Sequence, residues 1–294
     1  MKTGGLTLVI SAMEKAEILV EALPYIKEFY GKKVVIKYGG AAMIDCELKH
    51  KVMQDIVLMK YVGMHPIVVH GGGPEISGML KRLELKSEFV DGLRVTDAET
   101  MEIVEMVLVG KVNKEIVAGI EANGGKAVGI SGKDGGLLKA GPIDSTGRLG
   151  FVGEVRSVNP QIIETVIENG YIPVIAPIGM DNKQQSYNIN ADLAAAAIAV
   201  AMKADKLVLL TDVPGLLREP DNPSSLISVL KVSEVDNYIR DGIIAGGMLP
   251  KIKCCVEAVT GGVGRTHIID GRVPHSILLE IFTKQGIGTM VIDE

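Results

Sequence analysis

Lysines close to consecutive glycines are the residues of this sequence whose chemistry stands out. "VVIKYGG" at 34–40 runs an apolar, β-branched segment past Lys37 into two glycines. "GGMLPK" at 246–251 places two glycines before Lys251, and "VVHGGG" at 68–73 is a further glycine run. Because glycine has no Cβ, the backbone can approach a ligand closely and its N–H groups can cradle anionic oxygens. With a lysine beside it, such a turn predicts a phosphate site.

Acidic, basic and aromatic side chains near these turns are further candidates. "SYNINAD" at 186–192 puts Asp192 ahead of an Ala-rich segment, where it could cap a helix or orient nearby lysines. "GLRVTD" at 92–97 contains Arg94, whose guanidinium could grip a carboxylate through two hydrogen bonds or stand solvated at the surface. For His70, just before the second glycine run, packing or a structural hydrogen bond is favoured over catalysis.

Two common nucleotide-binding fingerprints are absent from the sequence. No G-x-x-x-x-G-K-[ST] occurs, and no strand-like segment runs into G-x-G-x-x-G. Neither a P-loop NTPase nor a nicotinamide-dependent enzyme is therefore supported. The formal net charge of −5 argues against non-specific nucleic-acid binding, which needs a basic surface. A local cationic pocket around a phosphate remains compatible with that charge.

Cysteine use and apolar runs indicate the compartment. Cys46, Cys254 and Cys255 show no C-x-x-C spacing, so we interpret them as free thiols in a reducing environment. The first residues do not resemble a signal peptide, and the apolar run at 193–202 is shorter than the roughly 20 residues that span a bilayer. We expect a cytoplasmic protein without a nucleic-acid or membrane partner.

Strand-like apolar runs alternate with segments of helical periodicity along the chain. This alternation predicts an α/β fold in which helices cover both faces of a mostly parallel sheet. A turn-rich segment at 132–155 predicts a hairpin, and the polar segment at 179–186 predicts a loop at a lobe boundary. The expected strands are 33–38, 65–71, 127–131, 172–177, 206–212, 266–271 and 288–293, and the expected helices are 46–62, 74–85, 100–124 and 191–204.

The N-terminal arm, about residues 10–30, carries apolar residues at helical spacing from Ile18 to Tyr30. Pro24 interrupts the pattern, so we expect a kinked helix or a helix that restarts there. The apolar face of this helix must be buried. It could pack on its own domain or against another subunit.

Taken together, "KYGGAAM", "VVHGGGPEI", "GLRVTD", "YNINAD", "LLTDVPGLL" and "GGMLPK" resemble the amino acid kinase family, from about residue 32 to the C-terminus. The resemblance implies the three-layer αβα sandwich of that family, with a central mostly parallel sheet. "GLRVTD" and "NINAD" favour the branch that phosphorylates N-acetyl-L-glutamate with ATP, an early step of arginine biosynthesis.

The resemblance also implies roles for individual residues. The implied catalytic residues are Lys37, Lys251, Asp192, Gly40 and Gly73, with the lysines on the transferring phosphoryl group and Asp192 organising them. The implied substrate-binding residues are Gly72, Gly73, Arg94 and Asn188. The implied ATP-binding residues are Thr211, Asp212, Gly215, Leu216, Gly247 and Met248.

The chemistry of phosphoryl transfer agrees with this set of residues. The transfer requires positioning and charge neutralisation, which lysines, glycine amides and Mg²⁺ carried by ATP would supply. The nucleophile would be a carboxylate with a reference pKa of about 4.3, so no general base is needed. Two alternatives stay open: a family member acting on another carboxylate or a carbamate, and a non-catalytic amino-acid sensor. The presence of both Lys37 and Lys251 argues against the sensor.

The resemblance implies regulation as well. Family members with an N-terminal helix are inhibited by L-arginine, and their arms link dimers into a hexamer, a trimer of dimers. "HSILLEIFTKQGIGTM" at 275–290 resembles the segment that binds arginine in those members, with His275, Glu280, Gly286 and Gly288 as the candidate residues. We therefore divide the chain into an oligomerisation arm (1–30), a substrate-binding lobe (31–180) and a lobe for ATP and arginine (181–294).

Overall fold

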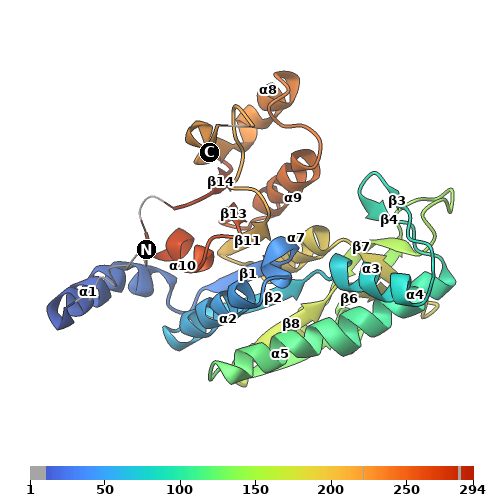
Figure 1. Ribbon diagram of the computed structural model, residues 1–294, viewed down its shortest axis with the longest axis horizontal. Helices are drawn as coiled ribbons and strands as arrows, with labels where there is room; N and C mark the ends of the chain where they lie inside the picture. Colours follow the sequence, from blue (N-terminus) through green and yellow to red (C-terminus); the bar gives the residue numbers. More distant parts are fainter. Residues whose placement is uncertain (1–10, 221, 284–285) are drawn as a thin grey trace, which may run out of the picture.

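The computed structural model describes residues 11–220, 222–283 and 286–294. Its centre is an eight-stranded sheet with the order β12-β14-β13-β11-β1-β2-β8-β5 (Figure 1). Every neighbouring pair in it is parallel except β13 and β14. The strands are β1 (Lys33–Tyr38), β2 (His65–His70), β5 (Ala127–Ser131), β8 (Ile172–Ala176), β11 (Lys206–Thr211), β12 (Val229–Lys231), β13 (Arg265–Asp270) and β14 (Thr289–Ile292).

Alternate side chains of β1 point into two separate cores, because successive residues of a strand face opposite sides of the sheet. Val34 and Ile36 join the core formed with α2, α4 and α5, whereas Val35 joins the core formed with α6, α7 and α9. The predicted αβα sandwich is confirmed. The helices are α2 (Cys46–Tyr61), α3 (Gly73–Arg82), α4 (Ala98–Glu105), α5 (Asn113–Ala122), α6 (Gln161–Glu168), α7 (Ala191–Ala201), α8 (Val235–Arg240), α9 (Met248–Thr260) and α10 (Ser276–Phe282).

A smaller sheet packs beside α7 and combines β6 (Leu138–Pro142), β7 (Val152–Val158), β9 (Ile178–Met180) and β10 (Ser186–Ile189). The antiparallel pair of β6 and β7 confirms the predicted hairpin at 132–155. The predicted loop at 179–186 is correct only in its middle, since its ends belong to β9 and β10, which pair with each other. A short hairpin of two strands with two residues each, β3 (Phe89–Val90) and β4 (Leu93–Arg94), lies outside both sheets.

The helix predicted over 100–124 is continuous but consists of three helical segments. Between α4 and α5, residues Met106–Val112 form a π-helical segment. Such a segment adds a residue per turn and rotates the helix faces relative to each other. Hydrophobic spacing alone did not reveal it.

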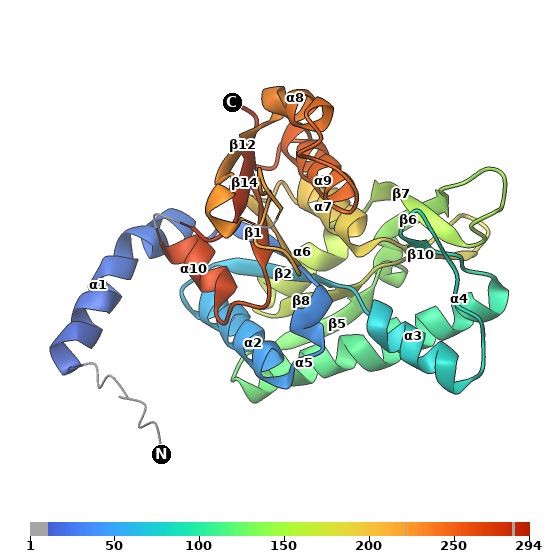
Figure 2. The same cartoon turned by 45° about the horizontal axis from the view of Figure 1, so that its top comes forward.

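The arm forms a single helix, α1 (Ala12–Phe29), that continues through Pro24 instead of restarting there. It begins with a capping box, in which Ser11 and Glu14 each bond the other's backbone N–H. Figure 2 shows α1 leading away from the body of the molecule. Its C-terminal end packs beside α10, and Phe29 is buried in the core. Ile18, Leu19 and Leu23 are each more than half exposed. Residues 1–10, which belong to the predicted oligomerisation arm (1–30), lie outside the described residues.

Candidate active site

Two ammonium groups flank one carboxylate at the centre of the molecule. Lys37 Nζ lies 3.0 Å from Asp192 Oδ1, and Lys251 Nζ lies 3.1 Å from Asp192 Oδ2. The three side chains come from β1, the first turn of α7 and the first turn of α9, and all are mostly buried. The structure therefore brings the three residues together as one charged cluster.

Asp192 does not cap α7. Asn190 does so, because its side-chain oxygen accepts hydrogen bonds from the backbone N–H groups of Asp192 and Leu193. This corrects one of the two interpretations that the sequence left open. Burial alone would raise the pKa of Asp192, but the ammonium groups of Lys37 and Lys251 hold it below its usual value. The carboxylate is thus ionised and free to orient both lysines.

Gly40 allows the turn after β1 to approach the turn after β11. Its φ is +70°, and a Cβ there would lie 2.2 Å from Asp212 Oδ1. At Gly39 a Cβ would lie 2.6 Å from Lys37 Nζ, so the missing side chain leaves the space that the ammonium group occupies. Glycine at position 40 therefore permits the close approach of the two turns. The contact of these turns with a phosphate stays a prediction.

The second glycine run is organised by His70, which is fully buried. Its Nδ1 donates to Gly71 O at 2.7 Å, and its Nε2 accepts from Asn113 Nδ2 at 3.2 Å. Burial lowers the pKa of His70 to about 4, so the ring is neutral, as these two bonds require. The prediction of a structural role for His70 is confirmed.

A cavity of about 150 Å³ opens beside this glycine run. All four residues predicted to bind substrate line it: Gly72, Gly73, Arg94 and Asn188. Residues Asn190 and Ala191, which immediately precede Asp192 in the sequence, also line it. The cavity thus reaches the segment that carries Asp192, the carboxylate between the two lysines.

Arg94 is buried, so the alternative of a solvated surface arginine is wrong. Its guanidinium donates to Gly73 O at 3.1 Å, to Ser77 Oγ at 2.8 Å and to Ser87 Oγ. The guanidinium group of Arg94 lies over the ring of Phe89, with Cζ 4.6 Å from the ring centroid. Burial lowers the pKa of Arg94, but a guanidinium stays charged at neutral pH. The fork is therefore held in place as a fixed cation on the cavity wall.

Four of the six residues predicted to bind ATP lie at the ends of two elements. Thr211 is the last residue of β11, which lies beside β1, and Asp212 follows it, while Gly247 caps and Met248 begins the helix that carries Lys251. Leu216 is buried, and its N–H donates to Thr289 Oγ1 at 2.7 Å. Its side chain therefore belongs to the core and is not available to a ligand.

Three of the four predicted arginine-site residues line a cavity of about 350 Å³: Glu280, Gly286 and Gly288. Tyr25, Glu28 and Phe29 of α1 line the same cavity, so the arm and the C-terminal segment meet there. His275 does not line it. That side chain turns to the buried Asp55 of α2, with 2.5 Å between Nδ1 and Oδ1. Residues 284–285 of the predicted segment lie outside the described residues.

Sequence reasoning missed a polar chain in this second cavity. Lys206 Nζ lies 3.3 Å from His267 Nε2, and His267 Nδ1 lies 2.7 Å from Glu280 Oε1. Burial lowers the pKa of both Lys206 and His267. Lys206 is the first residue of the apolar strand β11, and His267 interrupts the apolar strand β13. These polar residues in apolar segments were the only signal in the sequence for a buried polar chain.

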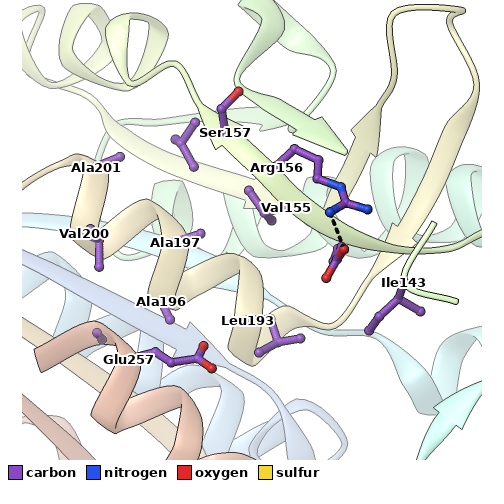
Figure 3. Close-up of a pocket in the computed structure, with 13 residues that line it drawn as sticks. Ile143, Val155, Arg156, Ser157, Leu193, Ala196, Ala197, Val200, Ala201 and Glu257 are labelled. Carbon is purple, nitrogen blue, oxygen red and sulfur yellow. Dashed lines mark ion pairs between the residues drawn. The ribbon is translucent and has the colours of Figure 1, made fainter. Parts of the chain in front are cut away.

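Another cavity, of about 490 Å³, lies between β7 and the face of α7 that carries Ala196, Ala197 and Val200 (Figure 3). Arg156 and Glu154 both line it and form an ion pair, with 2.7 Å between the charged atoms. None of the candidate site residues predicted from the sequence lines this cavity. The candidate site is therefore the smaller cavity, which is lined by Gly72, Gly73, Arg94 and Asn188.

Comparison with known proteins agrees with the family resemblance that the sequence motifs indicate. The model of the amino acid kinase family matches residues 32–270. Acetylglutamate kinase of Syntrophomonas wolfei subsp. wolfei is 79% identical over 287 residues, which cover 98% of this chain and 100% of that protein. Acetylglutamate kinase of Moorella thermoacetica is 63% identical, over 97% of this chain and 99% of that protein.

Two solved structures illustrate how widely the fold is shared. N-acetylglutamate synthase from Neisseria gonorrhoeae, complexed with coenzyme A and N-acetyl-glutamate, has a TM-score of 0.83 at 26% identity. The match covers 95% of this chain but 63% of the synthase. Carbamate kinase from Giardia lamblia bound to AMP-PNP has a TM-score of 0.67 at 19% identity, over 90% of this chain and 99% of that one. At that identity the likeness concerns the fold alone.

Proposed function

The chain belongs to the amino acid kinase family, and from that premise we propose that it transfers the γ-phosphoryl group of ATP to the side-chain carboxylate of N-acetyl-L-glutamate. The product is N-acetyl-L-glutamyl 5-phosphate, an intermediate of arginine biosynthesis. The observation that carries the proposal is the cluster of Lys37, Asp192 and Lys251 beside the cavity of Arg94 and Asn188.

The two lysines neutralise the charge that is shared between the attacking carboxylate, the phosphoryl group and the leaving ADP. Asp192 holds both ammonium groups within 3.1 Å of its oxygens and so fixes their positions before the substrates bind. Preorganised charge of this kind acts on the transition state without any cost of rearrangement during the reaction. The N–H groups of Gly40 and Gly73 donate to the phosphoryl oxygens from the two glycine turns.

Arg94 and Asn188 bind the α-carboxylate of the substrate, which leaves its side-chain carboxylate to face the lysines. That carboxylate is ionised at neutral pH and needs no base. ATP lies against the turn of Thr211 and Asp212, the backbone at Gly215 and Leu216, and the start of α9 at Gly247 and Met248.

Mg²⁺ is carried by the ATP phosphates. Among the described residues, no group of three or more His, Cys, Asp or Glu side chains could hold a metal ion. The ligands of Mg²⁺ would include phosphate oxygens and water, because this ion keeps several waters and takes substrate phosphates as ligands in kinase sites. The ion supplies further positive charge to the transferring phosphoryl group.

ADP production tests the substrate assignment. The purified protein is assayed with ATP and N-acetyl-L-glutamate, L-glutamate, L-aspartate or carbamate. We expect activity with N-acetyl-L-glutamate far above that with the other acids. Preference for another carboxylate or for carbamate would favour the related kinases of this family, and absence of turnover with every acid would favour a sensor.

We further propose that L-arginine inhibits the enzyme by binding the cavity between the arm (residues 1–30) and the ATP lobe (181–294), away from the substrate lobe (31–180). The cavity offers the carboxylates of Glu28 and Glu280 to a guanidinium. The exposed apolar face of α1 is the surface through which dimers join into a hexamer. Arginine inhibits because it binds one arrangement of the arms more tightly than the other.

Removal of residues 1–28 tests this regulation. The intact chain should be a hexamer by light scattering and should be inhibited by L-arginine. The truncated chain should be an active dimer without arginine response. A dimeric intact chain, or a truncated chain that arginine still inhibits, would contradict the role of the arm. Among the described residues, no helix is long and apolar enough to cross a membrane.

We also propose that the protein is cytoplasmic, in keeping with its three free cysteines.

A further inference from the structure

Thr96 lies between two of the residues that line the substrate cavity, although it does not line the cavity itself. Its side chain is fully buried. The hydroxyl donates to the backbone oxygen of Arg94 at 2.7 Å, and Asn188 Nδ2 lies 3.2 Å from the same hydroxyl oxygen. One hydroxyl group thus connects the segment of Arg94 to the side chain of Asn188.

The backbone of Thr96 is fixed independently of these contacts. Its N–H donates to Leu149 O at 3.1 Å, and its carbonyl accepts from Phe151 N–H at 2.6 Å. A Cβ on Gly150 would lie 2.2 Å from the Thr96 carbonyl oxygen, so the chain at 149–151 fits closely against it. The hydroxyl therefore extends from a rigid point, and its position does not depend on a bound substrate.

The direction of the two hydrogen bonds follows from the number of protons available. A threonine hydroxyl has one proton, and a backbone carbonyl can only accept. The proton of Thr96 is therefore used on Arg94 O, and its oxygen is left as an acceptor. Only the NH₂ end of the Asn188 amide can face an acceptor, which sets the orientation of that amide.

The consequence concerns what Asn188 presents to a ligand. With one N–H used on Thr96, the amide has a second N–H and its carbonyl oxygen left over, and Asn188 has no other side-chain hydrogen bond within the described part of the chain. If the amide were rotated by 180°, its oxygen would face the oxygen of Thr96, and the groups offered to the cavity would change places. A substrate with a carboxylate beside an amide would distinguish these two states.

We propose that Thr96 is a positioning residue for substrate binding, which fixes the orientation of the Asn188 amide and couples it to the segment that carries Arg94. This inference rests on the proposed function of the cavity. Thr96 does not touch the substrate and acts only through Asn188 and the Arg94 backbone.

Two variants separate the hydroxyl from the shape of the side chain. Thr96→Val has nearly the same volume and lacks the hydroxyl, whereas Thr96→Ser keeps it. We expect Thr96→Val to raise the KM for N-acetyl-L-glutamate about tenfold, the loss expected for one hydrogen bond. The KM for ATP and kcat should change by less than about twofold. Thr96→Ser should stay within about threefold of the wild type in every constant.

A double-mutant cycle tests whether the effect passes through Asn188. Asn188→Ala alone should raise the KM for the acid, and adding Thr96→Val to it should raise that KM by less than about twofold more. Fully multiplicative effects of the two substitutions would overturn the proposal. Equal changes in both KM values and kcat in Thr96→Val would overturn it as well, because they indicate general damage to the fold.

Failure of this inference differs from failure of the proposed function. If the wild type prefers another acid, the proposed substrate is wrong, and the same comparison is made with the preferred acid. If Thr96→Val cannot be purified, Thr96→Ser decides the question. A tenfold rise in KM in that variant would show that the hydroxyl is not what matters.

Discussion

The two glycine turns that follow β1 and β2 lie side by side but work in different ways. Tyr38 and His70 are partners in the register of the two strands, and Gly71 N–H donates to Tyr38 O at 2.8 Å. On the first turn, Lys37 carries a charge that Asp192 orients. On the second, His70 is neutral and buried, and it holds the backbone in place through Gly71 O. The first turn thus follows a strand that carries an ammonium group, whereas the second offers only backbone amides.

The largest expected effect is that of removing the lysines, including Lys37 beside the first glycine turn. Lys37→Ala and Lys251→Ala should each lower kcat on the order of 10²–10³-fold and change the KM values much less, because these charges act on the transition state. Lys253→Ala, at an exposed position of α9, is the matched control and should leave the kinetics unchanged. Turnover close to the wild type in Lys37→Ala would remove the contrast between the turns.

The second prediction concerns the neutral turn and the pH dependence of stability. The pKa of His70 is lowered to about 4, below its unfolded value near 6.5, so the unfolded chain binds the proton more readily. The folded state should lose on the order of 3 kcal/mol from this group as the pH falls from about 6.5 to 4. Chemical denaturation of His70→Gln should show a shallower loss over this window.

Comparison of the two proteins removes the contributions of other groups. Burial raises the pKa of Asp55 to about 6, which stabilises the folded state on acidification, but the group is present in both proteins. Parallel pH profiles for the wild type and His70→Gln would mean that His70 is not the neutral, buried group described here.

A third prediction concerns the cavity beside the second turn. Arg94→Lys keeps the charge and loses the planar fork that bonds Gly73, Ser77 and Ser87. The KM for the acid should rise about tenfold, with the KM for ATP nearly unchanged. Arg82→Lys, at an exposed position of α3, serves as the control. An equal rise in both KM values would argue against a role limited to the acid.

The smallest effect sharpens the comparison at the first turn. A methyl group at position 39 would lie 2.6 Å from Lys37 Nζ, the movable end of a flexible side chain. Gly39→Ala should therefore displace the ammonium group and lower kcat several-fold to about tenfold, with the free energy of unfolding changed by less than about 0.5 kcal/mol. Gly78→Ala, with no atom within 4 Å of its new methyl group, should leave kcat unchanged.

The strands of the central sheet other than β12 were predictable because buried parallel strands read as continuous apolar runs, as at 33–38 and 206–212. β12, α6, α8 and α9 were not predicted. The glycine turns were predictable as points of close approach, but the approach of Gly40 to Asp212 was not. The π-helical segment at 106–112 was not predictable, since its residues keep a helix-like apolar spacing.

Within the candidate site, the residues with obvious chemistry could be predicted from the sequence. The hydrogen bonds that hold them in place could not. Lysines, Arg94 and Asn188 stand out by their chemistry. Thr96 and Asn113 do not, because a buried threonine or asparagine in a sequence looks like any polar residue of a turn or helix. Their importance depends on hydrogen bonds across 92 and 43 positions of the chain. The roles of the site residues in catalysis stay predictions.

The place of β1 between β2 and β11 sets the order in which the protein can be completed during synthesis. Lys37 pairs with Leu209, and that partner leaves the ribosome on the order of 10–30 s after it, at the usual rate of translation. Until then β1 is the edge of an unfinished sheet, with open hydrogen-bonding groups beside apolar side chains. The nascent chain must therefore be protected from pairing with other chains for most of its synthesis, and conditions that slow elongation should lower the yield of soluble protein before they affect the finished enzyme.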